Sequence, residues 1–140
     1  MKTTELLNQL PLIFTTLFVA ILFIQSGLDK VFNFKGNLEW LSGHFSKTFL
    51  ARSVPMMLVT ITIVEVAAGV LAAVGLVYFL VTGSTVLIFY SSILAAGGLT
   101  ALFFGQRIAQ DYPGAAVLVP YFILVLILMH LSHAPLGSAM

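Results

Sequence analysis

The sequence predicts an all-α integral membrane protein: a four-helix bundle with a short interfacial helix between the first two spans. The chain of 140 residues is 60% hydrophobic and only 8% charged, whereas soluble domains carry about 25% charged residues. Its apolar residues gather in long segments, and a helix crosses a bilayer with about 20 of them. We therefore predict one transmembrane domain over residues 1–140, with spans at about 11–30, 55–80, 85–104 and 115–131.

The first span begins after a short polar start. Pro11 fits the first turn of a helix, where a missing N–H costs nothing. We expect the helix to continue through Asp29 and Lys30 to about residue 34. Because no small-residue cleavage site follows this segment, we interpret it as a retained span rather than a signal peptide.

A polar stretch over residues 32–52 joins the first and second spans. Leu38, Leu41 and Phe45 recur in it at helical spacing, with Trp40 beside them. This pattern is typical of an amphipathic helix lying in the membrane interface, with its tryptophan among the headgroups. A lid over a binding site is the alternative reading of the same segment.

The second span carries one charged residue, Glu65, near its middle. An ionisable group at that depth costs about 2.5 kcal/mol or more, so it should face the protein interior. Small residues follow it, including Gly69 and Ala72, and these favour close helix packing. Glu65 could be a proton, ion or ligand site, or a protonated acid that is hydrogen-bonded to a neighbour.

The third span should pack against the second. Gly97 and Gly98 lie on a face of small residues suited to a close helix contact. Judged by depth in the membrane, Tyr90, Ser91 and Ser92 are the nearest candidate hydrogen-bond partners for Glu65. The link before this span is uncharged and contains a glycine, which predicts a tight turn between antiparallel helices.

A second polar stretch separates the third and fourth spans. Arg107 and Asp111 are four residues apart and would share a helix face if the helix continued. We expect Pro113 and Gly114 to break the helix there. Tyr121 lies in the first half of the fourth span and is a further candidate site residue.

The ends of the first and third spans carry similar polar residues on the same side of the membrane. We expect them to form a polar funnel above Glu65. The first span contributes Gln25, Ser26, Gly27, Asp29 and Lys30, and the third contributes Gly105, Gln106, Arg107 and Asp111. Such a funnel could bind a polar headgroup or a quinone ring, or admit protons. Ion pairs that only anchor the helix ends are the alternative.

Composition excludes several kinds of chemistry. The chain has no cysteine, so it can contribute no disulfide, thiol nucleophile or cysteine-bound iron–sulfur cluster. A net charge of +1 gives no reason to expect nucleic acid as a partner. His130 and His133 share a helix face, but no carboxylate lies near them in sequence, so we predict interfacial residues and no metal site. We expect no intrinsic cofactor.

The positive charges predict an orientation. Most of the basic residues fall on the side of the two polar stretches, namely Lys30, Lys35, Lys47, Arg52 and Arg107, against Lys2 on the side of the termini. Since basic loops stay in the cytoplasm, we expect both polar loops inside and both termini outside.

Three segments resemble the DoxX family of small four-helix bacterial membrane proteins. They are residues 27–32 (GLDKVF), the pair Glu65 and Gly69, and residues 103–122 (FFGQRIAQDYPGAAVLVPYF). The resemblance implies a multi-pass protein of the bacterial inner membrane, in a family named after a membrane subunit of a thiosulfate:quinone oxidoreductase. The residues of this chain that the resemblance matches to the family pattern are Lys30, Glu65, Gly69, Arg107 and Asp111. The lack of cysteine argues against direct disulfide or thiosulfate chemistry.

These observations lead to three functional hypotheses. The first is a membrane subunit of a redox system, which offers a site for quinone or another lipid-like ligand and receives electrons from a partner subunit. The second is a carrier or channel for a small solute or protons, which with only four helices would need a homo-oligomer. The third is a non-catalytic assembly subunit. All three place the chain in contact with membrane lipid.

Overall fold

The computed structural model describes residues 3–133, and within that range every regular element is a helix. Lys2 and the end of the tail lie outside the described residues. The elements, in chain order, are α1 (Thr3–Asn8), α2 (Leu10–Phe32), α3 (Phe34–His44), the 3-10 turn η1 (Ala51–Ser53), α4 (Val54–Thr82), α5 (Val86–Ile108) and α6 (Tyr112–Ser132).

Four of these helices are long and apolar enough to cross a membrane: α2, α4 with η1, α5 and α6. The predicted four-helix membrane bundle is therefore confirmed, and α3 occupies the place of the predicted interfacial helix. The boundaries differ mainly at the second polar stretch. There α5 continues to Ile108 and α6 already begins at Tyr112, so the non-helical link is shorter than expected.

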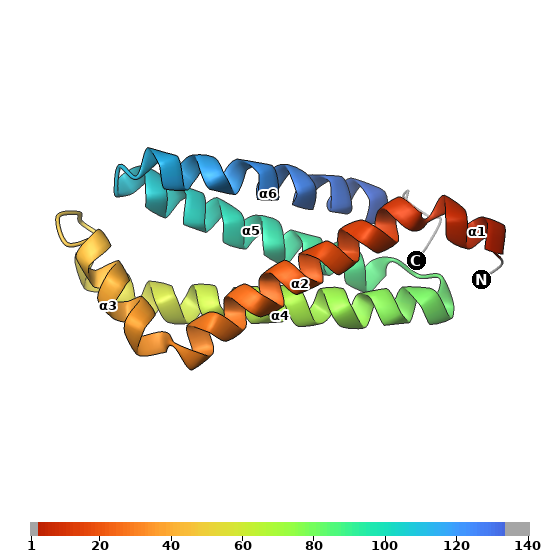
Figure 1. Cartoon of the computed structure of the whole chain (residues 1–140), viewed down its shortest axis with the longest axis horizontal. Coiled ribbons are helices and arrows are strands. Elements are labelled where there is room, and N and C mark those ends of the chain that lie inside the picture. The colour runs from red at the N-terminus through yellow and green to blue at the C-terminus, as the bar shows by residue number, and fades with distance from the viewer. Residues whose placement is uncertain (1–2, 134–140) are drawn as a thin grey trace.

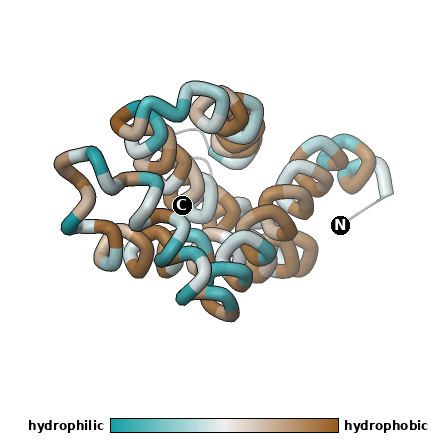
Figure 2. The backbone as a smooth tube through the Cα atoms, turned by 60° about the vertical axis from the view of Figure 1, so that its left-hand side comes forward, coloured by the Kyte–Doolittle hydropathy of each residue, from teal (hydrophilic) through white to brown (hydrophobic). Residues whose placement is uncertain are grey.

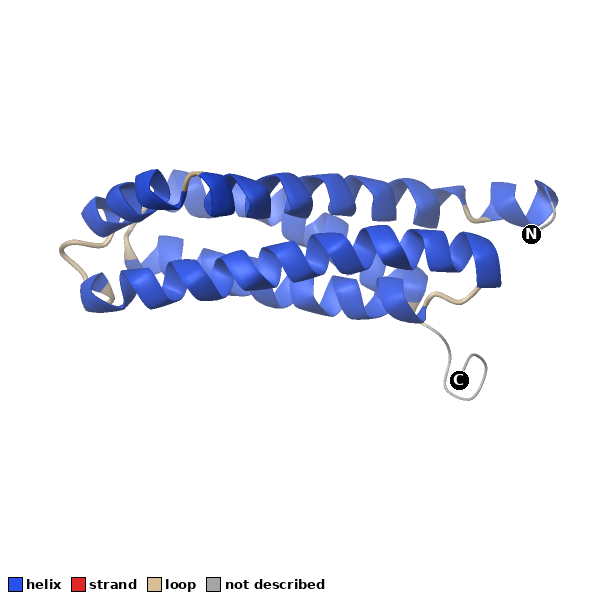
Figure 3. Ribbon diagram, turned by 90° about the horizontal axis from the view of Figure 1, so that it is seen from below, coloured by secondary structure: helices blue, strands red, loops and turns tan. Residues whose placement is uncertain are grey.

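The spans follow one another around the bundle. α2 packs on α4, α4 on α5 and α5 on α6, while α2 touches α6 less extensively (Figure 1). α3 and the α5–α6 link lie at one end, here called the loop side. α1, the α4–α5 turn and the end of α6 lie at the other, the terminus side (Figure 3). Figure 2 shows hydrophilic residues gathered towards the loop side, which comes forward in that view.

Local sequence explains where the helices end. α4 stops at Gly83, whose φ of 79° is the left-handed conformation that glycine adopts without strain. Asp111 caps the start of α6, because its side chain accepts a hydrogen bond from the N–H of Gly114 at 2.9 Å. The expectation that Pro113 and Gly114 break the helix is wrong. Both lie in the first turn of α6, where proline needs no hydrogen-bond donor.

Small residues bring the spans close together. A Cβ added at Gly69 would lie 2.6 Å from the backbone nitrogen of Ile24, so α2 and α4 are in backbone contact there. Ala72 is fully buried on the same helix. At Gly98, a Cβ would lie 3.2 Å from a methyl group of Val64, across the α4–α5 interface. Gly97 differs, because a Cβ there would meet no atom within 4 Å.

Candidate functional site

Glu65 is the most deeply buried charged residue of the described chain, with 2% of its surface exposed. Its Oε2 accepts a hydrogen bond from the Ser26 hydroxyl at 2.7 Å and another from the Lys30 ammonium at 3.1 Å. Lys30 also donates to the Ser26 oxygen at 2.9 Å. We call these three mutually bonded residues the Glu65 cluster. The acid is therefore part of an ion pair that joins α2 to α4.

Helix direction explains why Lys30 and Glu65 meet. Every Cα–Cβ bond in a helix tilts towards that helix's N-terminus. α2 ends at the loop side, so Lys30 leans into the membrane; α4 begins there, so Glu65 leans up towards Lys30. Ser26 lies four residues before Lys30 and so shares its face of α2. Glu65 itself is about 17 Å along α4 from its start at Val54, at 1.5 Å per residue.

The expected partners of Glu65 on α5 do not contact it. Ser91 and Ser92 donate their hydroxyl protons to carbonyls of their own helix, at Ile88 and Phe89. Tyr90 is 54% exposed on the outer surface. This part of the prediction is wrong because depth alone does not say which face of a helix looks at which neighbour.

A second polar cluster lies at the loop side, where α3, α5 and α6 meet. The Nε2 of His44 is 2.8 Å from the Oε1 of Gln106 and 3.7 Å from the Oδ2 of Asp111. The His44 ring stacks on Trp40 with centroids 4.5 Å apart. We call His44, Gln106 and Asp111 the His44 cluster. It fastens the end of α3 to the junction of α5 and α6.

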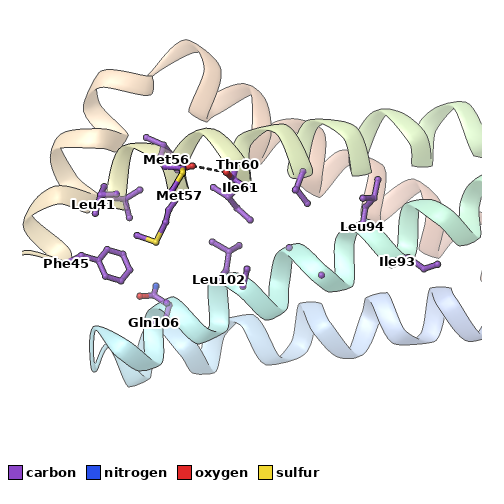
Figure 4. A pocket seen from close by; sticks show the side chains of 17 residues that line it. Leu41, Phe45, Met56, Met57, Thr60, Ile61, Ile93, Leu94, Leu102 and Gln106 are labelled. Carbon is purple, nitrogen blue, oxygen red and sulfur yellow. Dashed lines mark hydrogen bonds between the residues drawn. The ribbon is translucent and has the colours of Figure 1, made fainter. Parts of the chain in front are cut away.

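An apolar groove of about 510 Å³ runs between α4 and α5 and ends beneath α3 (Figure 4). Met57 and Ile61 of α4 point into it opposite Leu102 of α5, and Leu41 and Phe45 close its loop-side end. Its polar lining is confined to few groups, among them the Gln106 amide. The groove thus leads from the membrane interior to the His44 cluster.

Residues of α5 with a small side chain or none form one wall of this groove. Gly97, Ala101 and Gly105 recur every four residues, which places them on one helix face, and all three line the groove. The ring of Phe45 packs against Gly105, where a Cβ would lie 3.3 Å from its Cζ. At Gly97, by contrast, the space is open.

The predicted polar funnel is divided into separate parts. Lys30 is bonded to Glu65, and Gln106 and Asp111 both lie beside His44. Within residues 3–133, no hydrogen bond or ion pair joins these two clusters. Other candidates lie apart from both. They are Asp29, which is exposed and 3.5 Å from the Asn37 amide; Arg107, over the ring of Tyr112; and Tyr121, half-buried against the core.

Ser26 belongs to the predicted polar end of the first span, and its spacing of four from Lys30 places both on one face of α2. His44 was not expected as a site residue. It could not be recognised, since the chain between α3 and α4 gives no signal of where α3 will lie. His130 is exposed and His133 packs edge-on against Phe89. Over residues 3–133, no group of three or more acidic or histidine side chains could hold a metal ion.

Comparison with known families is consistent with this architecture. The DoxX family model matches residues 13–89, which cover most of α2, all of α3 and α4, and the start of α5. This stretch contains the whole Glu65 cluster and ends before Gln106 and Asp111. Searches of curated proteins and of solved structures gave no significant match. Because the family model covers more than half of the chain, the protein belongs to the DoxX family.

Proposed function

We propose that this DoxX protein is a membrane subunit of a quinone-linked redox system and that it binds the quinone in the α4–α5 groove. One observation carries the proposal: an apolar groove of about 510 Å³ that leads to a hydrogen-bonding pair, Gln106 and His44, at the membrane surface. Sites for small molecules typically measure about 300–1,000 Å³ and are mostly apolar, with a few polar groups that orient the ligand.

The two ends of the groove match the two parts of a lipid-soluble quinone. The isoprenoid tail would lie against Met57, Ile61 and Leu102, whose side chains are apolar and flexible enough to follow its shape. The ring would lie at the loop side, where the side-chain NH2 of Gln106 can donate a hydrogen bond to a ring carbonyl. The open space beside Gly97 gives the tail its path along α5.

The proton and electron requirements of the reaction point to a partner subunit. Reducing a quinone to a quinol takes two electrons and two protons. His44, with Asp111 3.7 Å away, is a group that can pass protons from the loop-side water to a ring oxygen. The chain has no cysteine, and we propose that a redox partner supplies the electrons. In this proposal the protein lies in the bacterial inner membrane, with the polar loops in the cytoplasm and both termini outside.

The test starts from protein purified gently in native-lipid particles. Mass spectrometry should find a quinone co-purifying with the wild type, and native mass spectrometry of the same sample reports partner subunits and oligomeric state. Gly97→Phe should fill the groove and lower the bound quinone by about tenfold or more, a loss of at least about 1.4 kcal/mol of binding free energy.

Thr100→Phe is the matched control, because Thr100 is an exposed residue of the same helix that does not line the groove. It should retain the quinone. Equal quinone content in both variants, with both folded, would count against the groove as the binding site. Wild-type particles that contain only bulk phospholipid after expression in a quinone-producing host would refute the quinone itself.

A further inference from the structure

We propose that Glu65 and Ser26 form a proton-binding site buried between α2 and α4, and that Lys30 is the built-in cation that fills this site when no proton is bound. This inference does not depend on the groove or on its ligand. It rests on the three contacts of the Glu65 cluster and on the unequal exposure of its members.

The geometry shows a site for a positive charge. The ammonium of Lys30 is held by two oxygens, the Glu65 Oε2 at 3.1 Å and the Ser26 Oγ at 2.9 Å. These two oxygens are themselves bonded at 2.7 Å, so they stay together whether or not Lys30 is present. The side chain of Glu65 is 2% exposed and that of Lys30 is 17% exposed. Lys30 is therefore the member that can leave towards the loop side.

Lys30 is placed to move. It lies two residues before the end of α2 at Phe32, and a lysine near a helix end ordinarily extends its flexible stem to bring its charge to the membrane surface. Here the stem points the other way, into the interface with Glu65. The attraction of one buried carboxylate holds it there, and removing that negative charge removes the attraction.

Two arrangements of the cluster then compete. In the first, the buried Glu65 carboxylate is paired with the partly buried Lys30 ammonium, and both have given up hydration at a cost that the pairing only partly offsets. In the second, Glu65 is a neutral acid and the Lys30 charge is at the surface, so no charge is buried. The second arrangement needs one proton, and it becomes favoured as the proton concentration on the loop side rises.

The transfer is balanced and involves no electrons. A proton from loop-side water binds a carboxylate oxygen of Glu65 and gives the neutral acid. Lys30 keeps all of its protons and its charge, and its ammonium moves outward. The Ser26 hydroxyl, which donates to Glu65 in the ion pair, can accept the new acid proton instead, because a hydroxyl both donates and accepts. The return of Lys30 releases the proton.

The other charged groups on the neighbouring elements are either exposed or in contact with residues outside the Glu65 cluster. On α2, Asp29 is exposed and lies 3.5 Å from Asn37 of α3. On α5, Arg107 lies over the Tyr112 ring, and at the start of α6 Asp111 contacts His44. On α3, Lys35 and Glu39 are exposed. Between residues 3 and 133, the charged group bonded to Glu65 is Lys30.

The first experiment measures the position of Lys30 with an amine-reactive, membrane-impermeant reagent in lipid particles. Glu65→Gln imitates the protonated acid at constant pH. We expect Lys30 to be labelled about tenfold faster in this variant than in the wild type, equivalent to about 1.4 kcal/mol. Lys35, which is exposed in any case, is the internal control and should react equally in both. Equal labelling of Lys30 would overturn the proposal and leave a static ion pair.

The second experiment observes the proton on the unmodified protein. Infrared spectra of the wild type should gain a carboxylic-acid C=O band as the pH falls, and Glu65→Gln should lack that band. Lys30→Met, which keeps the stem but removes the cation, should show the band already at neutral pH. A folded wild type that never gains it would overturn the proposal. The quinone content of Glu65→Gln should equal that of the wild type, so this result is separable from the test of the groove.

Discussion

Replacing Gly69 by alanine adds a single methyl group at the closest approach of α2 and α4. That Cβ would lie 2.6 Å from the backbone nitrogen of Ile24 and 3.0 Å from the carbonyl carbon of Phe23. Carbon atoms in favourable contact are about 3.5–4.0 Å apart. Backbone atoms cannot rotate away as a side chain can, so α2 must move by about 1 Å to relieve the contact.

The size of the effect follows from comparing two equivalent changes. Overpacking a close contact costs about 1–3 kcal/mol, while Gly→Ala inside a helix gains about 0.5–1 kcal/mol from backbone entropy. Gly97→Ala gives the same entropy gain without the clash, because its Cβ would meet no atom within 4 Å. The difference between the two variants in free energy of unfolding therefore contains only the steric cost at Gly69. We therefore expect Gly69→Ala to be less stable than Gly97→Ala by about 1–3 kcal/mol.

The assay is reversible unfolding in mixed micelles, in which added dodecyl sulfate is titrated and the loss of helix signal is followed by circular dichroism. Gly97→Ala should unfold at or slightly above the wild-type midpoint, and Gly69→Ala clearly below it. If the two variants unfolded together, backbone contact at Gly69 would not be what holds α2 against α4, and the packing argument would fail.

Three further predictions follow from contacts elsewhere in the bundle. Asp111→Ala should lose about 0.5–2 kcal/mol of stability because the cap of α6 disappears, whereas Asp111→Asn keeps an oxygen for the Gly114 N–H and should lose less in the same titration; an equal loss would assign the effect to the His44 contact instead. A double-mutant cycle of Lys30→Met and Glu65→Gln should give a coupling energy of about 0.5–3 kcal/mol, and strict additivity would show that the ion pair contributes nothing. Gly98→Ala meets only a methyl group of Val64, at 3.2 Å, so it should cost less than Gly69→Ala, and a larger cost would indicate that Val64 cannot move.

Much of the fold could be predicted because the membrane leaves the chain few options. A segment of about 20 apolar residues must form a helix to satisfy its own backbone, so four such segments determine four spans. The turn at Gly83 and the small residues of α4 followed from equally local rules. The inward position of Glu65 followed from the cost of exposing an acid to lipid.

The partners of Glu65 could not be predicted from depth. Serines in membrane helices often donate to a carbonyl of their own preceding turn, as Ser91 and Ser92 do, and the sequence does not say which serine will do so. The choice of Ser26 and Lys30 depends on how α2 and α4 are rotated about their axes. That rotation is set by the contact of Gly69 with Ile24, a property of two helices together.

The groove and the His44 cluster could not be predicted from the sequence, for a different reason. A groove is space that side chains do not fill. In the sequence, a row of glycine and alanine on α5 is equally consistent with a groove wall and with a face that packs against another helix. Gly98 does pack, while Gly97, its neighbour in sequence, borders open space. Only the placement of α3 over the end of this space, through His44 and Phe45, gives the groove a closed and polar end.

The ion pair between α2 and α4 also bears on how the protein is made. Taken alone, α4 would have to enter the bilayer with an unpaired acid near its middle, at a cost of about 2.5 kcal/mol or more. α2 precedes α4 in the chain, so Ser26 and Lys30 have already left the ribosome when Glu65 reaches the translocon. The acid can then enter lipid already bonded to its partners. A chain in which the order of these two helices was exchanged would have the same contacts in the finished bundle, but Glu65 would then be the charge that enters first and alone.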